Sequence, residues 1–404
     1  MNYFYNECGI KPYKRKNAQG KWVETSDVDA MKRISRRGIK GSKAAQIMLD
    51  IRSFEKRIST YLNVEKVDKD GRYRSSYKPV GAETGRLSSG ETIFGRGGNQ
   101  QNWPHDLLRY FLFDEGYLGY SIDLSQIENR IVAYVGGVLE LIKAFENGVD
   151  VHRLTASMIF GKPYDEISDK DGSSTLGDGR QSERFWGKKG NHGIDYDEGY
   201  KTFALKNEMS EGDAKAVLGK IHRAYPQIKN SYHQLIQNML LKNRTVTNLF
   251  GRNRLFLGPV IPSYPDVPKS ACQNTFREAY AHLHQSTRAD KINEQGLEYV
   301  YYNQDLFRPV ELLAQIHDSI VFQIPLSIPW EEHARMLRLI KESLEQPLYW
   351  HETEIKTPCD LSIGLNMCKE DMIEYKSKNI PNDGQFAIQL KGTYDRLKNP
   401  RNSG

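Results

Sequence analysis

Apolar residues recur at helical spacing along most of the chain. Between residues 42 and 61 they occur at Ala45, Ile47, Met48, Ile51, Phe54 and Ile58, and the series 47, 51, 54 and 58 advances by three or four positions at each step. This period is typical of a helix with one apolar face. The same reasoning predicts helices over residues 183–196, 210–225, 228–243, 270–290 and 331–347.

Three shorter apolar segments predict strands. GYLGYSIDL, residues 116–124, is a strand candidate that ends in a polar stretch. LLAQIHDSIVFQI, residues 312–324, consists of two apolar arms around the polar tip His-Asp-Ser, which is the pattern of a β-hairpin. A last strand is predicted near residues 359–365. The segment after residue 368 is polar and is expected to be partly disordered.

Composition narrows the class of protein without identifying it. The 404 residues carry a net charge of +6, which is compatible with a polyanionic partner but is also common in proteins that bind no nucleic acid. The N-terminal residues lack the apolar core of a signal peptide, and no apolar run is long enough to cross a bilayer. The four cysteines lack metal-ligand spacing. These features predict a cytoplasmic protein with reduced thiols and no membrane contact.

Two aspartates are candidates for a metal centre. Asp123 ends the predicted strand 116–124, and Asp318 lies at the tip of the predicted hairpin. Two carboxylates brought side by side at strand ends in one sheet could hold two divalent ions roughly 3.5–4 Å apart. Taken singly, either aspartate is more often a loop or capping residue.

A third candidate is the helix ERFWGKKGNHGIDY, residues 183–196. Two cationic and then two aromatic residues recur every four positions, at Arg184, Lys188, His192 and Tyr196. That spacing places them along one helical face. A nucleoside triphosphate along this face would meet phosphate-binding groups first and stacking groups next. The alternative is a solvated basic face with a core tyrosine.

These segments resemble the motifs of family A DNA polymerases, the DNA polymerase I type. SIDLSQIENR is similar to motif A, the helix at 183–196 to motif B and QIHDSI to motif C. GAETGRLSS, NQQNWP, DVHRLTASMIFG, TNLFGRNRLFL and the helix that contains Gln273 resemble further signatures of the family. The motifs occur in family order from about residue 40 to 368, and the short, divergent chain suggests a phage-like enzyme that would act in the host cytoplasm.

The resemblance implies an α+β right-hand polymerase fold. The palm would carry an antiparallel sheet, the fingers would be helical, and the thumb would be helical and partial. The implied divisions are a partial thumb at 1–80, a first palm part at 81–160, fingers at 161–260, a second palm part at 261–368 and a polar C-terminal tail at 369–404.

The resemblance also implies roles for individual residues. Two Mg²⁺ ions, or Mn²⁺ in their place, would be bound by Asp123, Asp318 and the Leu124 carbonyl. Lys188 would also protonate the departing pyrophosphate, and Glu128 would act as the steric gate against a ribose 2′-hydroxyl. The implied nucleotide-binding set is Arg184, Lys188, His192, Tyr196, Glu128 and Gln126. The implied DNA-binding set is Arg86, Asn99, Gln101, Asn102, Gln273 and His317.

The implied activity is template-directed extension of a primer with dNTPs. The partners would be primer–template DNA and a possible separate N-terminal polypeptide that supplies the rest of the thumb and an exonuclease, because no paired-carboxylate exonuclease pattern precedes residue 61. Two alternatives are a single-subunit RNA polymerase, which often has His-Asp-Ser in motif C, and an inactive nucleic-acid-binding subunit. The gate Glu128 and the TGRLSS signature favour a DNA polymerase.

The sequence departs from the family pattern at several positions. His192 stands where the family usually has Phe or Tyr, so discrimination against dideoxynucleotides cannot be carried over. Ser319 replaces a glutamate after the motif C aspartate, Leu124 replaces a tyrosine beneath the gate, and Asp197 replaces a glycine after the fingers helix.

Overall fold

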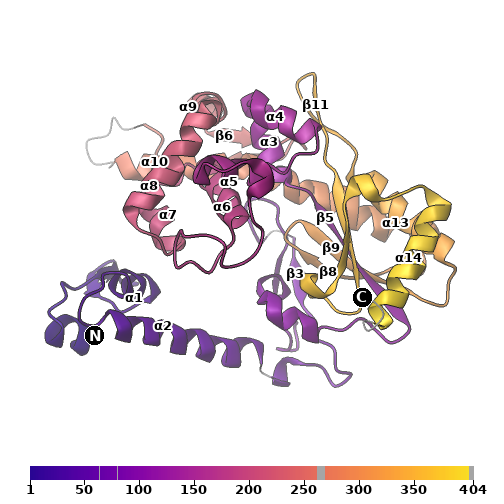
Figure 1. The fold of residues 1–404 in the computed structure, drawn as a ribbon, viewed down its shortest axis with the longest axis horizontal. Helices are drawn as coiled ribbons and strands as arrows, with labels where there is room; N and C mark the ends of the chain where they lie inside the picture. Colours follow the sequence, from indigo (N-terminus) through magenta and orange to yellow (C-terminus); the bar gives the residue numbers. More distant parts are fainter. Residues whose placement is uncertain (63, 80, 262–268, 400–404) are drawn as a thin grey trace. The chain divides into compact units, whose positions relative to one another are not determined.

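The structure is a computed structural model that describes residues 1–62, 64–79, 81–261 and 269–399. The chain divides into two compact units, and each unit combines segments that are distant in sequence (Figure 1). Unit 1 comprises Met1–Glu65 and Val149–Ala224, and unit 2 comprises Lys66–Gly148 and Tyr225–Gly404. The two units are described in turn, each by itself.

A five-stranded antiparallel sheet forms the centre of unit 2, in the strand order β13-β12-β5-β9-β8. Its strands are β5 (Tyr117–Leu124), β8 (Glu311–Ile316), β9 (Ser319–Pro325), β12 (Cys359–Gly364) and β13 (Ile373–Tyr375). β5 pairs with β12 on one side and β9 on the other, and nearly all its residues are buried. The predicted strands and hairpin are therefore confirmed.

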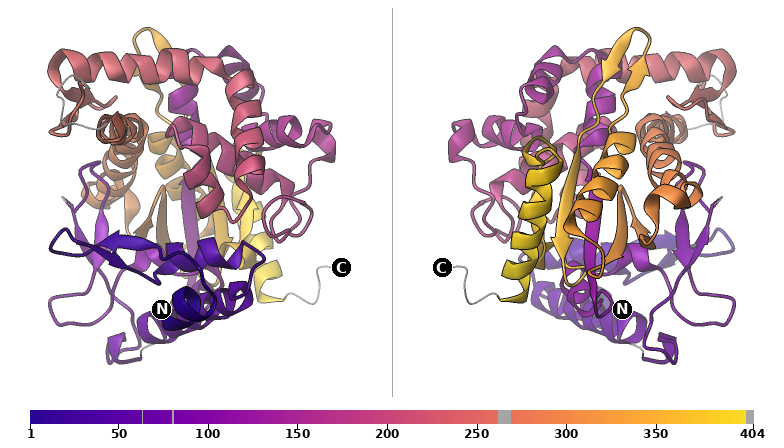
Figure 2. Two further views of the ribbon diagram at one scale, coloured as in Figure 1. Left: turned by 90° about the vertical axis from the view of Figure 1, so that its left-hand side faces the viewer. Right: turned by 90° about the vertical axis from the view of Figure 1, so that its right-hand side faces the viewer.

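Two helices, α13 (Trp330–Leu344) and α14 (Asp383–Lys398), lie side by side against this sheet (Figure 2). Leu337 of α13, Phe386 of α14 and Leu361 of β12 line the same small apolar space. Residues 369–399 thus contain a strand and a packed helix. The expectation that this region is partly disordered is wrong for residues 369–399, and residues 400–404 lie outside the described part.

Within the described residues, unit 2 contains six further helices. They are α3 (Ile127–Gly136), α4 (Leu139–Glu146), α9 (Gln234–Asn243), α10 (Lys269–Ile292), α11 (Tyr299–Tyr302) and α12 (Gln304–Phe307). The short 3₁₀ or π segments are η4 (Gln100–Asn102), η5 (His105–Tyr110), η7 (Ile228–His233), η8 (Asn293–Glu298), η9 (Lys369–Asp371) and η10 (Ser377–Asn379). A further segment, η3 (Val64–Lys66), begins in unit 1 and ends at the first residue of unit 2. Three hairpins complete the unit: β3 (Ser76–Lys78) with β4 (Ser88–Gly90), β6 (Thr245–Thr247) with β7 (Asn253–Leu255), and β10 (Leu348–Trp350) with β11 (Thr353–Ile355). α10 packs against α3, which is buried along its whole length.

Unit 1 is helical apart from the hairpin of β1 (Lys14–Lys16) and β2 (Trp22–Glu24). Its helices are η1 (Tyr3–Glu7), α1 (Val28–Ser35), α2 (Ser42–Lys56), η2 (Arg57–Tyr61), α5 (Val151–Phe160), η6 (Tyr164–Glu166), α6 (Glu183–Asp195), α7 (Tyr200–Lys206) and α8 (Glu211–Ala224). α6 packs along α5, and α8 contacts both. A Cβ on Gly187 of α6 would lie 1.9 Å from the His152 carbonyl oxygen of α5, so only glycine allows this close approach.

α2 and η2 form a continuous helical segment whose apolar side is exposed. α2 packs on α1 and the N-terminal residues through its other side. Five large apolar residues at intervals of three or four positions are from 49% to 64% exposed: Ile47, Ile51, Phe54, Ile58 and Leu62. We call these five residues the apolar stripe of α2. Isolated exposed apolar residues are common in folded proteins, but a row of this kind suggests a surface that another molecule covers.

The six helical segments predicted from apolar spacing coincide with α2–η2, α6, α8, η7–α9, α10 and α13. Within the described ranges, no helix combines the length and the apolar character that a membrane span needs.

Candidate active site

The two candidate metal-binding aspartates lie side by side at one end of the central strands. Asp123 is the penultimate residue of β5, and Asp318 lies in the two-residue turn between β8 and β9. Asp123 pairs in register with Ser319, which follows Asp318. The Leu124 amide donates a hydrogen bond to the Asp318 carbonyl oxygen at 3.2 Å. The predicted placement of both residues at strand ends of one sheet is confirmed.

Each aspartate also contacts a cationic side chain. Lys369 of η9 forms an ion pair with Asp123 Oδ2, and Arg288 Nη1 of α10 lies 3.5 Å from Asp318 Oδ2. Burial, followed by the negative charge of Asp318, raises the pKa of Asp123 to about 6, and the Lys369 ammonium opposes this rise. The corner therefore concentrates negative charge in a partly dehydrated setting, which favours the binding of cations.

The available ligands at this corner fit a divalent metal ion. Carboxylate and main-chain carbonyl oxygens are the ligands that Mg²⁺ and Mn²⁺ prefer. Among the described residues, no group of three or more His, Cys, Asp or Glu side chains forms a metal site. A metal here would therefore rely on Asp123, Asp318, a main-chain oxygen such as that of Leu124, and oxygens of the substrate. Mg²⁺ sites that act on phosphates commonly have this composition.

Glu128, in the first turn of α3, is buried beside this corner. Arg86 Nη2 and Arg288 Nη1 each lie 2.7 Å from Glu128 Oε1, and His284 Nδ1 lies 3.4 Å from Glu128 Oε2. Burial alone would raise the pKa of Glu128, but Arg288, His284 and Arg86 together hold it well below its usual value. Glu128 is thus an ionised carboxylate in a fixed position.

Backbone strain marks two of the predicted site residues in unit 2. His317, at the hairpin tip, and Gln126, directly before α3, have φ values of +56° and +53°. Such values are costly for residues with a side chain and persist where the surrounding structure imposes them, often at functional sites. Burial lowers the pKa of His317, while the negative charge of Asp318 opposes this shift. His317 therefore tends to be neutral beside the aspartate.

The predicted DNA-binding residues of loop 99–104 connect to the hairpin that carries Asp318. Asn99 Oδ1 caps η4 by accepting the Gln101 amide at 2.9 Å. Gln101 Nε2 donates to Gln315 Oε1 of β8 at 2.8 Å. Asn102 and Gln273 have exposed side chains, so both are accessible to a ligand.

In unit 1, the four residues predicted to bind the nucleotide form one face of α6. Lys188 is exposed and Arg184, His192 and Tyr196 are half-buried, whereas Trp186 on the other side is fully buried. The predicted single face is therefore confirmed. The rings of His192 and Tyr196 lie 6.2 Å apart.

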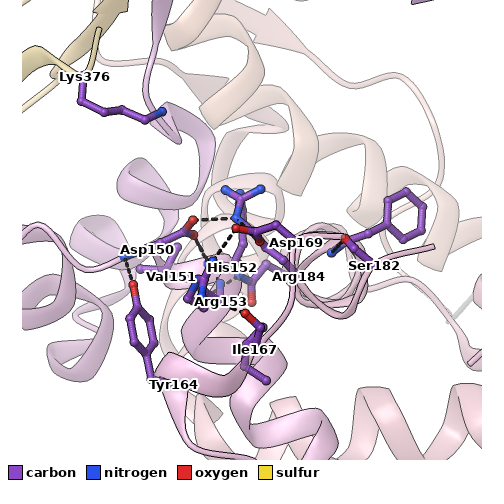
Figure 3. Close-up of polar contacts among 12 residues, drawn as sticks. Asp150, Val151, His152, Arg153, Tyr164, Ile167, Asp169, Ser182, Arg184 and Lys376 are labelled. Carbon is purple, nitrogen blue, oxygen red and sulfur yellow. Dashed lines mark hydrogen bonds and ion pairs between the residues drawn. The ribbon is translucent and has the colours of Figure 1, made fainter. Parts of the chain in front are cut away.

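Arg184 is oriented by two carboxylates (Figure 3). Its Nε lies 2.6 Å from Asp150 Oδ2 and 3.7 Å from Asp169 Oδ1. Asp150 is itself fixed as the cap of α5, where its side chain accepts the His152 and Arg153 amides. In the described part of the chain the contacts of Arg184 are made by Nε, so both Nη groups can bind an anion.

The predicted site residues thus form two sets. Unit 2 brings together Asp123, Asp318, Glu128, Arg86 and His317, and unit 1 holds the face of α6. Because the two units are described separately, the approach of α6 to the aspartates stays a prediction. The positive φ of Asp197, +50°, gives the physical reason why a glycine is usual after this helix.

Sequence reasoning missed four residues that shape the site: Arg288, His284, Lys369 and Asp150. Arg288 and His284 lie one turn apart on α10, so their spacing was a signal that they share a face. Lys369 lies between β12 and β13 of the sheet, in the segment that the sequence predicts to be a polar tail. Asp150 precedes the apolar start of α5 and has the residue type of a helix cap.

The family model described as DNA polymerase family A matches residues 1–369 of this sequence. The chain therefore belongs to DNA polymerase family A. It is 29% identical over 290 residues to DNA polymerase I of Pseudomonas aeruginosa, covering 69% of this chain and 29% of the relative. It is 26% identical over 371 residues to DNA polymerase I of Treponema pallidum, covering 89% of this chain and 33% of the relative. The chain thus spans about a third of the length of these curated relatives.

A solved structure shares the fold. It is described as the POL domain of Pol1 from M. smegmatis in complex with DNA primer-template and dNTP. The TM-score is 0.69 at 22% sequence identity, and the match covers 90% of this chain and 59% of the other. The predicted α+β polymerase fold and family are therefore confirmed.

Proposed function

We propose that this chain is a template-directed DNA polymerase that adds dNTPs to a primer 3′ end by two-metal phosphoryl transfer. The observation that carries the proposal is the pairing of Asp123 with Asp318 at adjoining strand ends, beside the buried Glu128. Relatives named DNA polymerase I and a fold neighbour solved with primer-template and dNTP support it. Acting on DNA, the enzyme would work in the cytoplasm.

In this proposal the residues of unit 2 hold the reacting groups. Two Mg²⁺ ions, or Mn²⁺ in their place, would lower the pKa of the primer 3′-hydroxyl and offset charge on the departing pyrophosphate. Asp123, Asp318 and the Leu124 carbonyl would hold these ions. Glu128 occupies the space that a ribose 2′-hydroxyl would need, and Gln126 lies beside the bound nucleotide.

The α6 face binds the incoming nucleotide. The free Nη groups of Arg184 and the Lys188 ammonium contact the triphosphate, where their charges stabilise the transition state most. Lys188 donates a proton to the pyrophosphate. The rings of His192 and Tyr196 pack against the sugar and the templating base.

The primer–template would contact loop 99–104 and the hairpin tip. Asn99, Gln101 and Asn102 position the backbone, and His317 and Gln273 contact the primer end. Arg86 also faces the minor groove, where the acceptors are similar for every correct base pair. Such contacts sense shape without selecting a sequence.

Primer extension tests the proposal. The purified chain, Mg²⁺ and a primed DNA template are supplied with dNTPs or rNTPs. The wild type should extend the primer with dNTPs, and Asp318→Ala should extend at least 1,000-fold more slowly. Glu311→Gln is the matched control, because Glu311 lies at the opposite end of the same hairpin. It should retain activity.

Other outcomes would redirect the assignment. Efficient use of rNTPs would make the chain an RNA polymerase. DNA binding without extension, in the presence of all partners, would make it an inactive binding subunit. We further propose that this chain does not proofread. A 3′-mismatched primer should therefore not be shortened, and its shortening by the chain alone would contradict this part of the proposal.

We also propose that a helix of a separate N-terminal polypeptide covers the apolar stripe of α2 and completes the thumb. The exposure of the stripe supports this. The probe is a polypeptide from the same organism that resembles the N-terminal part of the relatives. In sedimentation experiments it should bind the wild-type chain but not the Phe54→Glu variant. Lys56→Glu, at an exposed polar position of the same helix, should still bind. Self-association of this chain through the stripe would contradict the proposal.

A further inference from the structure

Arg288 is shared between two carboxylates with different proposed roles. Its Nη1 atom lies 2.7 Å from Glu128 Oε1 and 3.5 Å from Asp318 Oδ2. Its side chain is only 10% exposed. A buried charge in contact with two carboxylates is much less screened by solvent than a surface ion pair.

The charges of this cluster balance only when both carboxylates are counted. Arg86 and Arg288 supply two positive charges, and Glu128 and Asp318 supply two negative ones. Arg86 makes the same 2.7 Å contact with Glu128 as Arg288 does, from a loop rather than from α10. Among the described residues, Arg288 is the cationic side chain that contacts Asp318.

One guanidinium cannot hold both carboxylates equally well through a single nitrogen. The shorter distance shows that Glu128 has the stronger hold in this structure. If Glu128 lost its charge, the guanidinium would move toward Asp318 and compete with any cation that binds there. By thermodynamic reciprocity, a cation bound at Asp318 would weaken the Arg288–Asp318 contact and strengthen the Arg288–Glu128 ion pair.

We propose that Arg288 is a positioning residue that couples the Glu128 gate to the metal-binding Asp318. This inference rests on the proposed function, because the gate and the metal site are themselves proposals. In physical terms, metal binding strengthens the hold on the gate carboxylate. Selection against ribonucleotides should therefore improve as the Mg²⁺ concentration rises.

A double-mutant cycle on metal binding tests the coupling without relying on activity. Mn²⁺ binding to the protein alone is measured by electron paramagnetic resonance for the wild type, Glu128→Gln, Arg288→Met and the double variant. Glu128→Gln should weaken Mn²⁺ binding at least fivefold in the wild-type background. In the Arg288→Met background, the effect of Glu128→Gln on Mn²⁺ affinity should be at least threefold smaller, because Arg288, which transmits this effect, has been removed. Equal effects in both backgrounds would overturn the inference.

Arg86→Met serves as the control background for Arg288→Met in the double-mutant cycle. Arg86 contacts Glu128 at the same distance, so its loss should leave the effect of Glu128→Gln on Mn²⁺ binding intact. If Arg288→Met does not fold, Arg288→Gln replaces it. A glutamine is polar but carries no positive charge to share between the two carboxylates, so the coupling should again fall at least threefold. Unchanged coupling in Arg288→Gln would overturn the inference.

The same experiment separates this inference from the proposed function. Asp318→Asn should weaken Mn²⁺ binding at least tenfold. If it has no effect, the proposed metal site fails. If Asp318→Asn weakens binding but the cycle is additive, only the role of Arg288 fails. As a second readout, the ratio of dNTP to rNTP kcat/KM should rise with Mg²⁺ in the wild type and stay flat in Arg288→Met.

Discussion

Lys369 contacts the carboxylate that would have to receive a metal ion. Its side chain is 46% exposed and its ion pair with Asp123 is accessible to solvent. Such a cation can be displaced at little cost, since a partly exposed ion pair contributes roughly 0.2–1 kcal/mol. Lys369 would thus compete with the proposed metal for Asp123.

Replacing Lys369 by methionine should therefore tighten Mn²⁺ binding. We expect a gain of about two- to fivefold, the equivalent of one exposed ion pair, by isothermal titration calorimetry at pH 8. Lys376→Met is the matched control, because Lys376 pairs with Asp360 and Glu374 in the same part of the fold. Weaker binding in Lys369→Met would mean that Lys369 orients Asp123 for the metal instead of competing with it.

His333 should make stability depend on pH. It is fully buried on α13, where Nδ1 pairs with the Tyr120 hydroxyl at 2.7 Å and Nε2 with the Pro325 carbonyl at 3.1 Å. Burial lowers the pKa of His333 from 6.5 to about 4. The unfolded chain therefore binds this proton more tightly than the folded protein does. The stabilising contribution is complete above pH 6.5 and is lost as the pH falls toward 4.

From pH 8 to pH 5, this single group should remove about 2 kcal/mol of the free energy of unfolding. Urea denaturation at both pH values should show a loss about 2 kcal/mol smaller in His333→Gln than in the wild type. His351→Gln, at an exposed position, should show the wild-type loss. Equal losses in His333→Gln and the wild type would refute the assignment.

Individual residues show how far sequence reasoning reaches. Asp123 and Asp318 could be placed because each ends an apolar segment, and strand ends in one sheet meet at its edge. Arg288 and Lys369 could not be placed in the same way. Each of these cations matters to the site only because it pairs with a carboxylate from a distant segment of the chain. A local sequence pattern contains no information about that pairing.

At the level of elements, the packing of α5 against α6 depends on one missing side chain. Gly187→Ala would put a methyl group 1.9 Å from the His152 carbonyl oxygen. The backbones would have to separate, which should cost about 1–3 kcal/mol. Thermal denaturation should show this loss of stability.

Gly219→Ala in α8 is the control variant. The new Cβ would lie 3.6 Å from an Arg223 side-chain nitrogen, which is an ordinary contact, so this substitution should stabilise the helix by up to about 1 kcal/mol. A Gly187→Ala variant as stable as the wild type would contradict this packing.

α14 shows why an element can be missed even though its pattern is present. Phe386, Leu390 and Thr393 recur at intervals of three or four positions and are buried. The surrounding residues are polar, and two glycines lie within the helix, so the composition favoured disorder. The periodicity of the apolar residues was the better guide, because a helix needs only one apolar stripe to dock.

At the level of the whole molecule, the organisation into units is the feature least accessible to sequence reasoning. Residues 1–65 pack with residues 149–224, although residues 66–148 lie between them in the chain and belong to unit 2. Local patterns predicted α2–η2, α6 and α8 of unit 1 one by one. Which helices share a core depends on contacts between distant segments, and the family resemblance supplied that information only as an expected order of motifs.

The proposed function makes a prediction about the charge of the whole chain. The net charge of +6 and the proposed backbone contacts imply that DNA binding releases counterions. If roughly 6–10 phosphates are neutralised, affinity should fall by about 10³–10⁵ between 50 and 200 mM salt. Fluorescence anisotropy of a labelled primer–template over a KCl series measures this slope.

Two variants locate the charge that carries the effect. Lys78, exposed on β3, belongs to the hairpin that packs beside η4 and loop 99–104, so Lys78→Gln should reduce the slope by about 1. Lys391, exposed on α14, lies among helices that cover the sheet, and Lys391→Gln should leave the slope unchanged. A wild-type slope near zero would mean that phosphates contribute little to binding. Base contacts in this site are proposed to sense shape alone, so the chain would then have no source of sequence-independent affinity for DNA. A template-directed polymerase needs such affinity to move along DNA of any sequence.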